Sequence, residues 1–255
     1  SNLLKRLGFK ILRIDEPAEE PKIATITFGM IAPVLKQAGE RARKLVDKKL
    51  YQHQLDVINK LEAGFNVILI SGTGSGKTEA WAVYAIKNRK KVLAIYPTLA
   101  LSQDQVMRLE DYYSGFGSGA VLKIESETST RLPREKQREI RQKIAYADLV
   151  ITNPAFLLSD LKRYAKHGKP FLLRFISSVD IIVFDELDYY GSSKATLLIS
   201  GLAELITKYL SRKEPQICIL TATLGNPEEL KEFLTEINGR PTVIAVSYTH
   251  LTLPT

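Results

Sequence analysis

The chain of 255 residues has almost no cysteine, Cys218 being the single one. One thiol cannot form an internal disulfide bond or a multi-cysteine metal site. This scarcity excludes a disulfide-stapled secreted domain and a zinc-ribbon protein, and it indicates a reducing cellular compartment.

Long hydrophobic runs are also missing, because no apolar stretch approaches the roughly 18 to 20 residues of a membrane helix. The apolar residues near the N-terminus are interrupted by Lys5 and Arg6, too early for a signal peptide. We therefore expect a soluble cytoplasmic protein without a membrane partner, associated with the nucleoid if its source is prokaryotic. The chain starts with Ser1 in place of Met, and both of its ends are left out of the functional interpretation.

The composition is that of a globular protein, with 45% hydrophobic and 25% charged residues. Lysine and arginine number 36 against 28 acidic residues, which gives a net charge of +8. A moderate positive excess favours a polyanionic partner such as nucleic acid, although many soluble basic proteins have none.

Short apolar, mostly β-branched runs alternate with helical segments from about residue 51 onward. This rhythm predicts an α/β domain with a mainly parallel sheet of about seven strands and helices on both faces. The expected strands are 66–70, 92–96, 120–124, 148–151, 180–184, 216–220 and 242–246. The expected helices are 54–63, 77–88, 100–112, 133–145, 154–164, 194–210 and 227–236, with Pro133, Pro154 and Pro227 in first turns.

Three regions are expected along the chain. Residues 1–49 form an N-terminal extension, with a strand at 23–28 and then a basic run that is either a solvated helix face or a nucleic-acid contact. Residues 50–246 form the main domain. Residues 247–255 continue no periodic pattern, and we treat them as a tail outside the domain whose native origin the sequence does not establish. The basic run contains Lys36, Arg41, Arg43, Lys44, Lys48 and Lys49.

A glycine-rich loop, SGTGSGKT at 71–78, stands between the first expected strand of the main domain and a helix. In this context successive backbone N–H groups converge on phosphate oxygens at a helix N-terminus. Lys77 would reach the β- and γ-phosphates of a nucleotide, and the Thr78 hydroxyl would bind Mg²⁺. The predicted nucleotide-binding residues of this loop are Thr73, Gly74, Ser75, Gly76, Lys77 and Thr78.

Acidic residues follow the expected strand 180–184 in the string DELD at 185–188. The carboxyl end of that strand would bring Asp185 to the same sheet edge as the glycine-rich loop. Asp185 would hold Mg²⁺, and Glu186 would orient and deprotonate the attacking water, so that Lys77, Asp185 and Glu186 are the predicted catalytic residues. Signalling GTPases have an Asn-Lys-x-Asp string after the glycine-rich loop that reads guanine. The nearest string here is NKLE at 59–62, which lies before the loop and ends in Glu, so guanine specificity is not expected.

From residue 49 to 246 the ordered series of motifs resembles the first RecA-like domain of superfamily 2 (DExD/H-box) helicases. The string LYQHQ at 50–54 resembles their Q motif, which implies that Tyr51 and Gln54 border the adenine. The glycine-rich loop resembles motif I, with Ser71 where Ala is usual, and DELD resembles motif II, with Asp188 where many relatives have His.

Three further strings carry the resemblance. YPTLAL at 96–101 is similar to motif Ia, and TNP at 152–154 is similar to another backbone-contact motif, which implies that Pro97, Thr98, Thr152 and Asn153 bind nucleic acid. TAT at 221–223 is similar to motif III, so that Thr221, Thr223 and Asp188 would couple nucleotide state to nucleic-acid binding. LGNP at 224–227 resembles the Lhr-type DNA helicases.

The resemblance implies an ATP-dependent helicase or translocase that uses ATP and Mg²⁺ and acts on single-stranded or partly duplex nucleic acid, with DNA favoured over RNA. Such enzymes have a second RecA-like domain whose arginines reach the γ-phosphate, and 255 residues leave no room for one. We therefore expect a fragment with weak or no hydrolysis of its own. Two alternatives remain: an RNA-directed DExD-box helicase domain, and a non-catalytic nucleic-acid-binding protein regulated by ATP.

Overall fold

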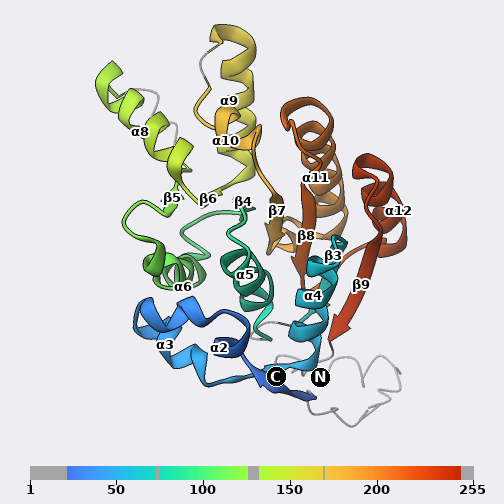
Figure 1. Ribbon diagram of the computed structural model, residues 1–255. Coiled ribbons are helices and arrows are strands. Elements are labelled where there is room, and N and C mark those ends of the chain that lie inside the picture. The colour runs from blue at the N-terminus through green and yellow to red at the C-terminus, as the bar shows by residue number, and fades with distance from the viewer. Residues whose placement is uncertain (1–21, 73–74, 126–131, 169, 248–255) are drawn as a thin grey trace, which may run out of the picture.

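A seven-stranded sheet forms the centre of the computed structural model, which describes residues 22–72, 75–125, 132–168 and 170–247 (Figure 1). All strand pairings in it are parallel. The predicted sheet is confirmed, with every strand boundary within one residue of expectation. In spatial order the strands are β5 (Val121–Lys123), β6 (Leu149–Thr152), β4 (Val92–Ile95), β7 (Ile181–Asp185), β8 (Gln216–Thr221), β3 (Asn66–Ser71) and β9 (Thr242–Ser247).

The sheet is buried on both faces because its strands are apolar at consecutive positions. On β7, Val183 packs into the core on one face, whereas Ile182 and Phe184 pack into the core on the other. The first face is covered by α4 (Gln52–Glu62), α5 (Lys77–Lys87) and α6 (Gln103–Tyr113). The second is covered by α8 (Arg134–Tyr146), α9 (Pro154–His167), α10 (Leu173–Ile176), α11 (Ser192–Glu204) with the π-helical turn η4 (Leu205–Leu210), and α12 (Pro227–Asn238).

The seven predicted helices are present, with three local differences. The segment 194–210 divides into α11 and η4, and the short helix α10 was not predicted. Pro154 and Pro227 stand in first turns as expected, but Pro133 is the N-cap residue of α8. Among the described residues, no helix is both long and apolar enough to cross a membrane.

The N-terminal extension packs on the same core as the main domain. Its strand β1 (Ile23–Thr27) pairs antiparallel with β2 (Lys49–Tyr51), and the expected boundary between residues 49 and 50 falls inside β2. Between these strands lie α2 (Phe28–Ile31), η1 (Pro33–Gln37) and α3 (Glu40–Val46). The Asp111 carboxylate on α6, just before the turn η2 (Ser114–Phe116), accepts from the backbone N–H of Ala42 at 2.7 Å. The extension is therefore fastened to the main domain.

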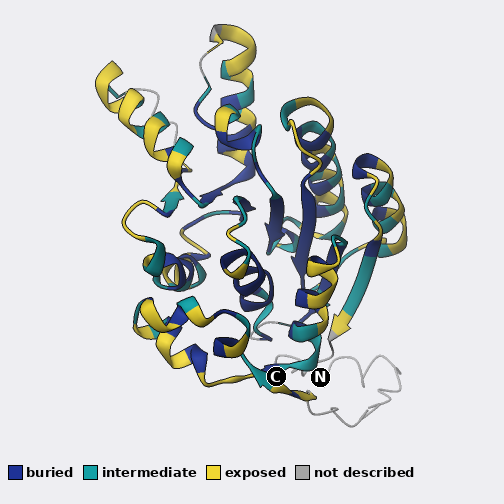
Figure 2. Ribbon diagram, in the orientation of Figure 1, coloured by how far each residue is buried: buried dark blue, intermediate teal, exposed yellow. Residues whose placement is uncertain are grey.

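Burial differs sharply between helices (Figure 2). Helix α5, which follows the glycine-rich loop, has nine buried residues out of eleven, including Trp81. Helix α8 has one, Ile144, and projects from the body beside α9 (Figure 1). The helix that carries the phosphate loop is thus fixed in the core, while α8 presents most of its side chains to solvent.

Candidate nucleotide and nucleic-acid site

The strand order decides which loops meet at the carboxyl edge of the sheet. Strands β3, β8 and β7 are neighbours, so the loop after Ser71, the turn at Thr221 and the carboxylate of Asp185 come together. Strands β4 and β6 continue the row beyond β7, and they bring Pro97 and Thr152 to the same edge. In open α/β sheets ligands bind at this edge.

A cavity of about 580 Å³ lies over this edge. Its wall also includes Phe28 and Leu45 from the N-terminal extension, which were not predicted as site residues. Thr73 and Gly74 fall outside the described residues. The predicted residues that line the cavity are Tyr51, Gln54, Ser75, Gly76, Lys77, Thr78, Pro97, Glu186, Asp188 and Thr221.

The lysine of the glycine-rich loop points back into its own loop. Lys77 Nζ donates to the carbonyl oxygens of Ser71 at 2.7 Å and Gly72 at 3.0 Å. Burial lowers the pKa of Lys77, while the charge of Asp185 opposes that change. The ammonium group is therefore held at the loop by two backbone carbonyl oxygens.

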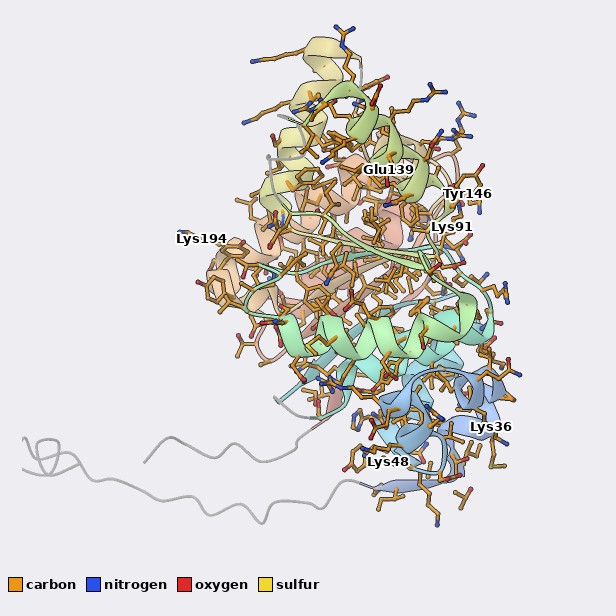
Figure 3. All side chains as sticks on the ribbon, turned by 90° about the vertical axis from the view of Figure 1, so that its left-hand side faces the viewer. Lys36, Lys48, Lys91, Glu139, Tyr146 and Lys194 are labelled. Carbon is orange, nitrogen blue, oxygen red and sulfur yellow. The ribbon has the colours of Figure 1, made fainter. Side chains whose placement is uncertain are left out.

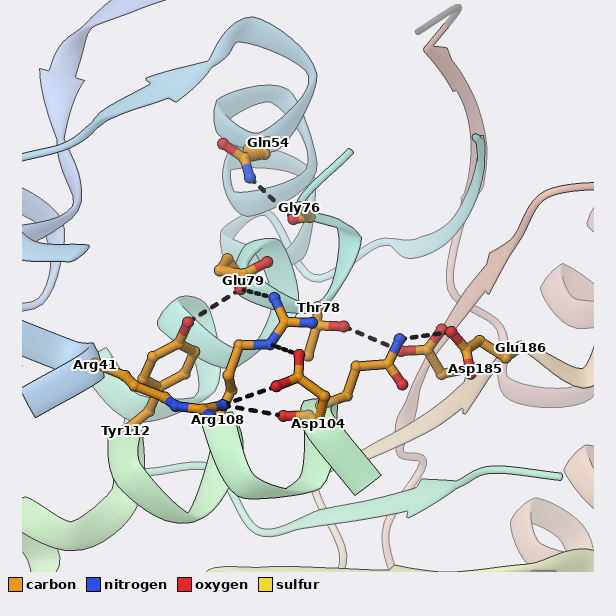
Figure 4. Close-up of polar contacts among 11 residues, drawn as sticks. Arg41, Gln54, Gly76, Thr78, Glu79, Asp104, Arg108, Tyr112, Asp185 and Glu186 are labelled. Atoms are coloured by element: carbon orange, nitrogen blue, oxygen red, sulfur yellow. Dashed lines mark hydrogen bonds and ion pairs between the residues drawn. The ribbon is translucent and has the colours of Figure 1, made fainter. Parts of the chain in front are cut away.

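The start of α4 braces this loop (Figure 4). Gln54 is 3% exposed; its Oε1 accepts from the Tyr51 backbone N–H at 2.8 Å, and its Nε2 donates to the Gly76 carbonyl at 2.9 Å. His53 Nε2 lies 3.0 Å from the Ser75 carbonyl oxygen. The Gln54 amide is thus used at both ends by the backbone, a contact that the sequence did not predict.

Asp185 is buried at the end of β7 with an incomplete set of partners. Its Oδ2 accepts from the Thr78 hydroxyl at 3.3 Å, and its Oδ1 has no hydrogen-bond partner among the described atoms. Burial, and next to it the charge of Glu186, raises the pKa of Asp185 to about 7. An unpaired buried carboxylate oxygen beside a hydroxyl fits a divalent cation.

The donor set suits magnesium in particular. Among the described residues no three His, Cys, Asp or Glu side chains are grouped as ligands. A cation held by Asp185 and Thr78 would need its other ligands from water and phosphate, which is how Mg²⁺ is usually bound with nucleotides.

Glu186 follows in a left-handed backbone conformation, with φ of 57°, before the turn η3 (Leu187–Tyr190). Both of its carboxylate oxygens accept hydrogen bonds from α6 and its N-cap: Oε1 from Gln105 Nε2 at 2.5 Å and Oε2 from the Ser102 hydroxyl at 3.3 Å. Neither donor was predicted from the sequence. Their spacing of three residues places both on one side of the start of α6, but no local pattern identifies Glu186 as their partner.

A second polar chain joins α5 to α6 and the extension (Figure 4). Glu79 is 6% exposed, and its Oε1 contacts Arg108 and the Tyr112 hydroxyl, each at 3.0 Å. Arg108 also pairs with Asp104 at 3.3 Å, and Asp104 pairs with Arg41 at 3.0 Å. Arg41, from the basic run, is thereby committed to an intramolecular contact.

The residues predicted to contact nucleic acid are not equally accessible. The Pro97 carbonyl accepts from the Tyr190 hydroxyl at 2.9 Å, and the Thr98 hydroxyl accepts from the Leu101 N–H at 3.2 Å. Thr152, the last residue of β6, is 0% exposed, so its hydroxyl does not reach the surface in this structure, and its contact with nucleic acid stays a prediction.

Asn153 is buried and acts as the N-cap of α9, where its Oδ1 accepts from the Phe156 N–H at 2.8 Å. Its Nδ2 donates to Glu125 Oε2 at 3.4 Å, and the same oxygen accepts from the Leu99 N–H at 3.0 Å. Glu125 therefore joins the two segments that the sequence assigned to nucleic-acid binding.

Two of the three predicted coupling residues reach the cavity. Asp188 and Thr221 line it, and the Thr221 hydroxyl donates to the carbonyl of Thr223 at 2.6 Å. Thr223 itself is exposed next to the cavity wall. The turn after β8 therefore lies between the phosphate loop and Asp185, the position expected of a nucleotide sensor.

Comparison with known proteins agrees with this arrangement. The model of the DEAD/DEAH box helicase family matches residues 51–232. The uncharacterized ATP-dependent helicase YprA of Bacillus subtilis (strain 168) is 30% identical over 82% of this chain. The crystal structure of the DUF1998 helicase MrfA bound to DNA and AMPPNP superposes with a TM-score of 0.68, at 21% identity over 97% of this chain. The helicase Lhr of Mycobacterium smegmatis, bound to ssDNA and AMP-PNP, gives a TM-score of 0.55, at 23% identity over 76%.

These proteins are all much longer. The chain covers 28% of YprA, 34% of the MrfA chain and 25% of the Lhr chain. The similarity therefore concerns one domain of each.

Proposed function

Because this chain belongs to the DEAD/DEAH box helicase family, we propose that residues 50–246 form the N-terminal RecA-like motor domain of an ATP-dependent helicase or translocase acting on DNA. The observation that carries this proposal is that the phosphate loop and Glu186 line one cavity, while Asp185, buried behind it, is hydrogen-bonded to Thr78 of that loop. The N-terminal extension forms one wall of that cavity with Phe28, Leu45, Lys48 and Lys49, and the domain continues to Ser247, the last residue of β9.

The nucleotide roles follow from the chemistry of the side chains. The loop amides from Thr73 to Gly76 would surround the phosphates, with Lys77 exchanging its carbonyl partners for phosphate oxygens. Thr78 and Asp185 would hold Mg²⁺, which when bound neutralises phosphate charge. Glu186 would take the proton of the attacking water.

Adenine would lie against α4. Tyr51 and His53 stack there with ring centroids 5.6 Å apart, and Tyr51 lines the cavity. Gln54 would read the adenine edge, because an amide offers both a donor and an acceptor, and it would give up its bonds to Tyr51 and Gly76 to do so. On this ground we propose ATP over GTP.

A second RecA-like domain would complete the site. The support for it is length, because the chain covers only 25% to 34% of the relatives named above. An arginine reaching the γ-phosphate is worth roughly 10³ to 10⁵ in rate. The domain alone should therefore bind ATP-Mg²⁺ and hydrolyse it slowly.

The nucleic-acid path would run over the ends of β4 and β6, next to the nucleotide cavity. Thr98, Asn153 and the backbone around Leu99 would bind phosphates without reading base sequence. DNA is favoured because MrfA and Lhr were solved with DNA. An RNA-directed helicase domain is the alternative, since the fold is shared with Mss116p bound to ssRNA.

Lys77→Ala tests the nucleotide site in the 255-residue chain. Titration with a fluorescent ATP analogue and Mg²⁺ should show at least a tenfold loss of affinity, which corresponds to about 1.4 kcal/mol. Lys36→Ala, which neutralises an exposed lysine of η1, is the matched control. A loss of less than about twofold in Lys77→Ala would refute the phosphate assignment.

The nucleic-acid path is tested with Thr98→Val and Asn153→Ser, the latter chosen because serine keeps an N-cap oxygen for α9 without placing a second carboxylate beside Glu125. Affinity for single-stranded DNA and RNA should fall while ATP-analogue affinity stays unchanged. Unchanged affinity for both nucleic acids would exclude this path. Tighter binding of RNA than DNA by the unmodified chain would favour the RNA-directed alternative.

A further inference from the structure

A second cavity lies at the opposite, amino-terminal edge of the sheet. It measures about 1030 Å³ and is bordered by the C-terminal ends of α8, α9, α10 and η4 and by the residues just before β4 and β8. Figure 3 shows Lys91, at this cavity, close to Tyr146 and far from Lys48, which lines the nucleotide cavity. The two cavities are therefore separate.

Four cationic side chains from four different segments line this amino-edge cavity. They are Lys91 before β4, Arg141 on α8, Arg174 on α10 and Arg212 before β8. None of the described residues that line it is acidic. Like charges around one cavity repel each other, and an anion between them would relieve that repulsion.

Helix C-termini account for part of this charge, because their partial negative charge attracts cations. Lys91 Nζ donates to the Ala145 carbonyl at 3.3 Å, near the end of α8. Arg141 is held differently: its Nε donates to the Pro170 carbonyl at 3.3 Å, and its guanidinium lies 4.5 Å from the centroid of the Phe171 ring. Arg174 and Arg212 differ: among the described residues neither guanidinium has a hydrogen bond or ion pair, and both are exposed. Intramolecular contacts therefore account for Lys91 and Arg141 but not for the guanidinium groups of Arg174 and Arg212.

Two tyrosines stand among the cations. Tyr164 is 46% exposed and Tyr209 is 72% exposed, although both border the cavity. Guanidinium groups and exposed aromatic rings that border one cavity suit a ligand that has both phosphates and flat bases. A simple anion has no flat surface to place against the rings.

The positive charge continues beyond the cavity along the two projecting helices. Helix α8 has five basic and two acidic residues, and α9 adds Lys162, Arg163 and Lys166 against Asp160. A positive electrostatic field that extends over two helices is larger than a single nucleotide requires, and it suits a polyanion such as a nucleic-acid strand. We propose that the amino-edge cavity, with Arg174, Arg212, Tyr164 and Tyr209, is a second binding site for single-stranded nucleic acid.

The test measures anisotropy of a labelled oligothymidylate with the 255-residue chain at several salt concentrations. Arg174→Gln with Arg212→Gln should weaken binding and reduce the slope of log affinity against log salt by about 0.7 for each lost phosphate contact. Tyr164→Ala with Tyr209→Ala should weaken binding without changing that slope. Lys194→Gln with Lys231→Gln removes the same charge from the surface elsewhere and is the control.

Three results would overturn the proposal. The first is an unchanged affinity and salt slope in the arginine pair. The second is an equal loss in the arginine pair and the lysine control, which would show only a long-range field. The third is tighter binding of polyglutamate than of the oligonucleotide with no effect of the tyrosine pair, which would indicate an acidic polypeptide. ATP-analogue binding, measured on the same variants, should stay unchanged, and it distinguishes failure here from failure of the nucleotide site.

Discussion

Gln54 donates from Nε2 to the backbone carbonyl of Gly76 at 2.9 Å, and this single contact joins the start of α4 to the residue that opens α5. Gly76 has φ of +72°, and a Cβ atom there would overlap that Nε2. The phosphate loop therefore depends on a glycine and a glutamine that fit each other.

Gln54→Leu should lower both stability and nucleotide affinity. The substitution removes two hydrogen bonds and leaves a buried N–H and a carbonyl unpaired, a cost of about 1 to 3 kcal/mol in the free energy of unfolding. Urea unfolding and ATP-analogue titration measure the two effects. Gln52→Leu is the control, since the Gln52 side chain bonds only Asp56 on the helix surface. Equal unfolding midpoints for Gln54→Leu and the control would contradict the bracing role.

Gln105→Leu should slow ATP turnover with little effect on ATP affinity, in a protein that includes the second RecA-like domain. Gln105 contacts Glu186 and lies on the helix that follows the nucleic-acid segment, so its loss frees the carboxylate to leave its position. We expect kcat to fall by about tenfold, the effect of about 1.4 kcal/mol, at constant KM. Gln103→Leu, at an exposed position of the same helix, is the control. A rise in KM at constant kcat would show that Gln105 acts on binding.

Glu186→Gln should retain ATP binding and abolish turnover in the same protein, because the amide keeps the shape of the side chain and cannot accept the proton. Single-turnover hydrolysis measures the chemical step directly. A normal rate in this variant would place the base elsewhere.

Asp185→Asn should stabilise the chain at about pH 8 in the absence of nucleotide and Mg²⁺. The pKa of Asp185 is raised from 3.8 to about 7, so the native state binds this proton more tightly than the unfolded chain. The tighter binding of this proton stabilises the native state fully below pH 3.8, and this stabilisation is lost as the pH rises to about 7. The variant has no such loss, and its advantage in melting temperature should shrink as pH falls from about 8 to about 4. An advantage that grows toward acid pH would contradict the buried-carboxylate account.

Cys218 should react with a thiol reagent only when the chain unfolds. It is 0% exposed on the central strand β8, and burial raises the pKa of its thiol. The rate of modification should therefore follow global unfolding across a denaturant series. Rapid stoichiometric reaction in native buffer would mean that the sheet opens locally.

Local patterns determined the elements and the motifs. Runs such as 181–184 are apolar at every position, which is enough to predict a buried strand, and the seven strands match to within one residue. The phosphate loop is contiguous along the chain, so local sequence was sufficient to assign Lys77 and Thr78 to it. The catalytic and binding roles of these residues remain predictions.

Only the tertiary structure decided which segments meet. The order of strands placed β8 between β3 and β7, and no local pattern encodes that order because it depends on packing between distant segments. Glu186 and Gln105 are 81 residues apart, so their contact could not be predicted from spacing. The motif that contains Thr152 favoured this residue as a phosphate contact. The burial of Thr152, however, is set by the strands and helices packed around β6, which the motif does not encode. Side-chain chemistry can be read along the chain, whereas accessibility and adjacency arise from long-range packing, and these decide what each side chain can bind.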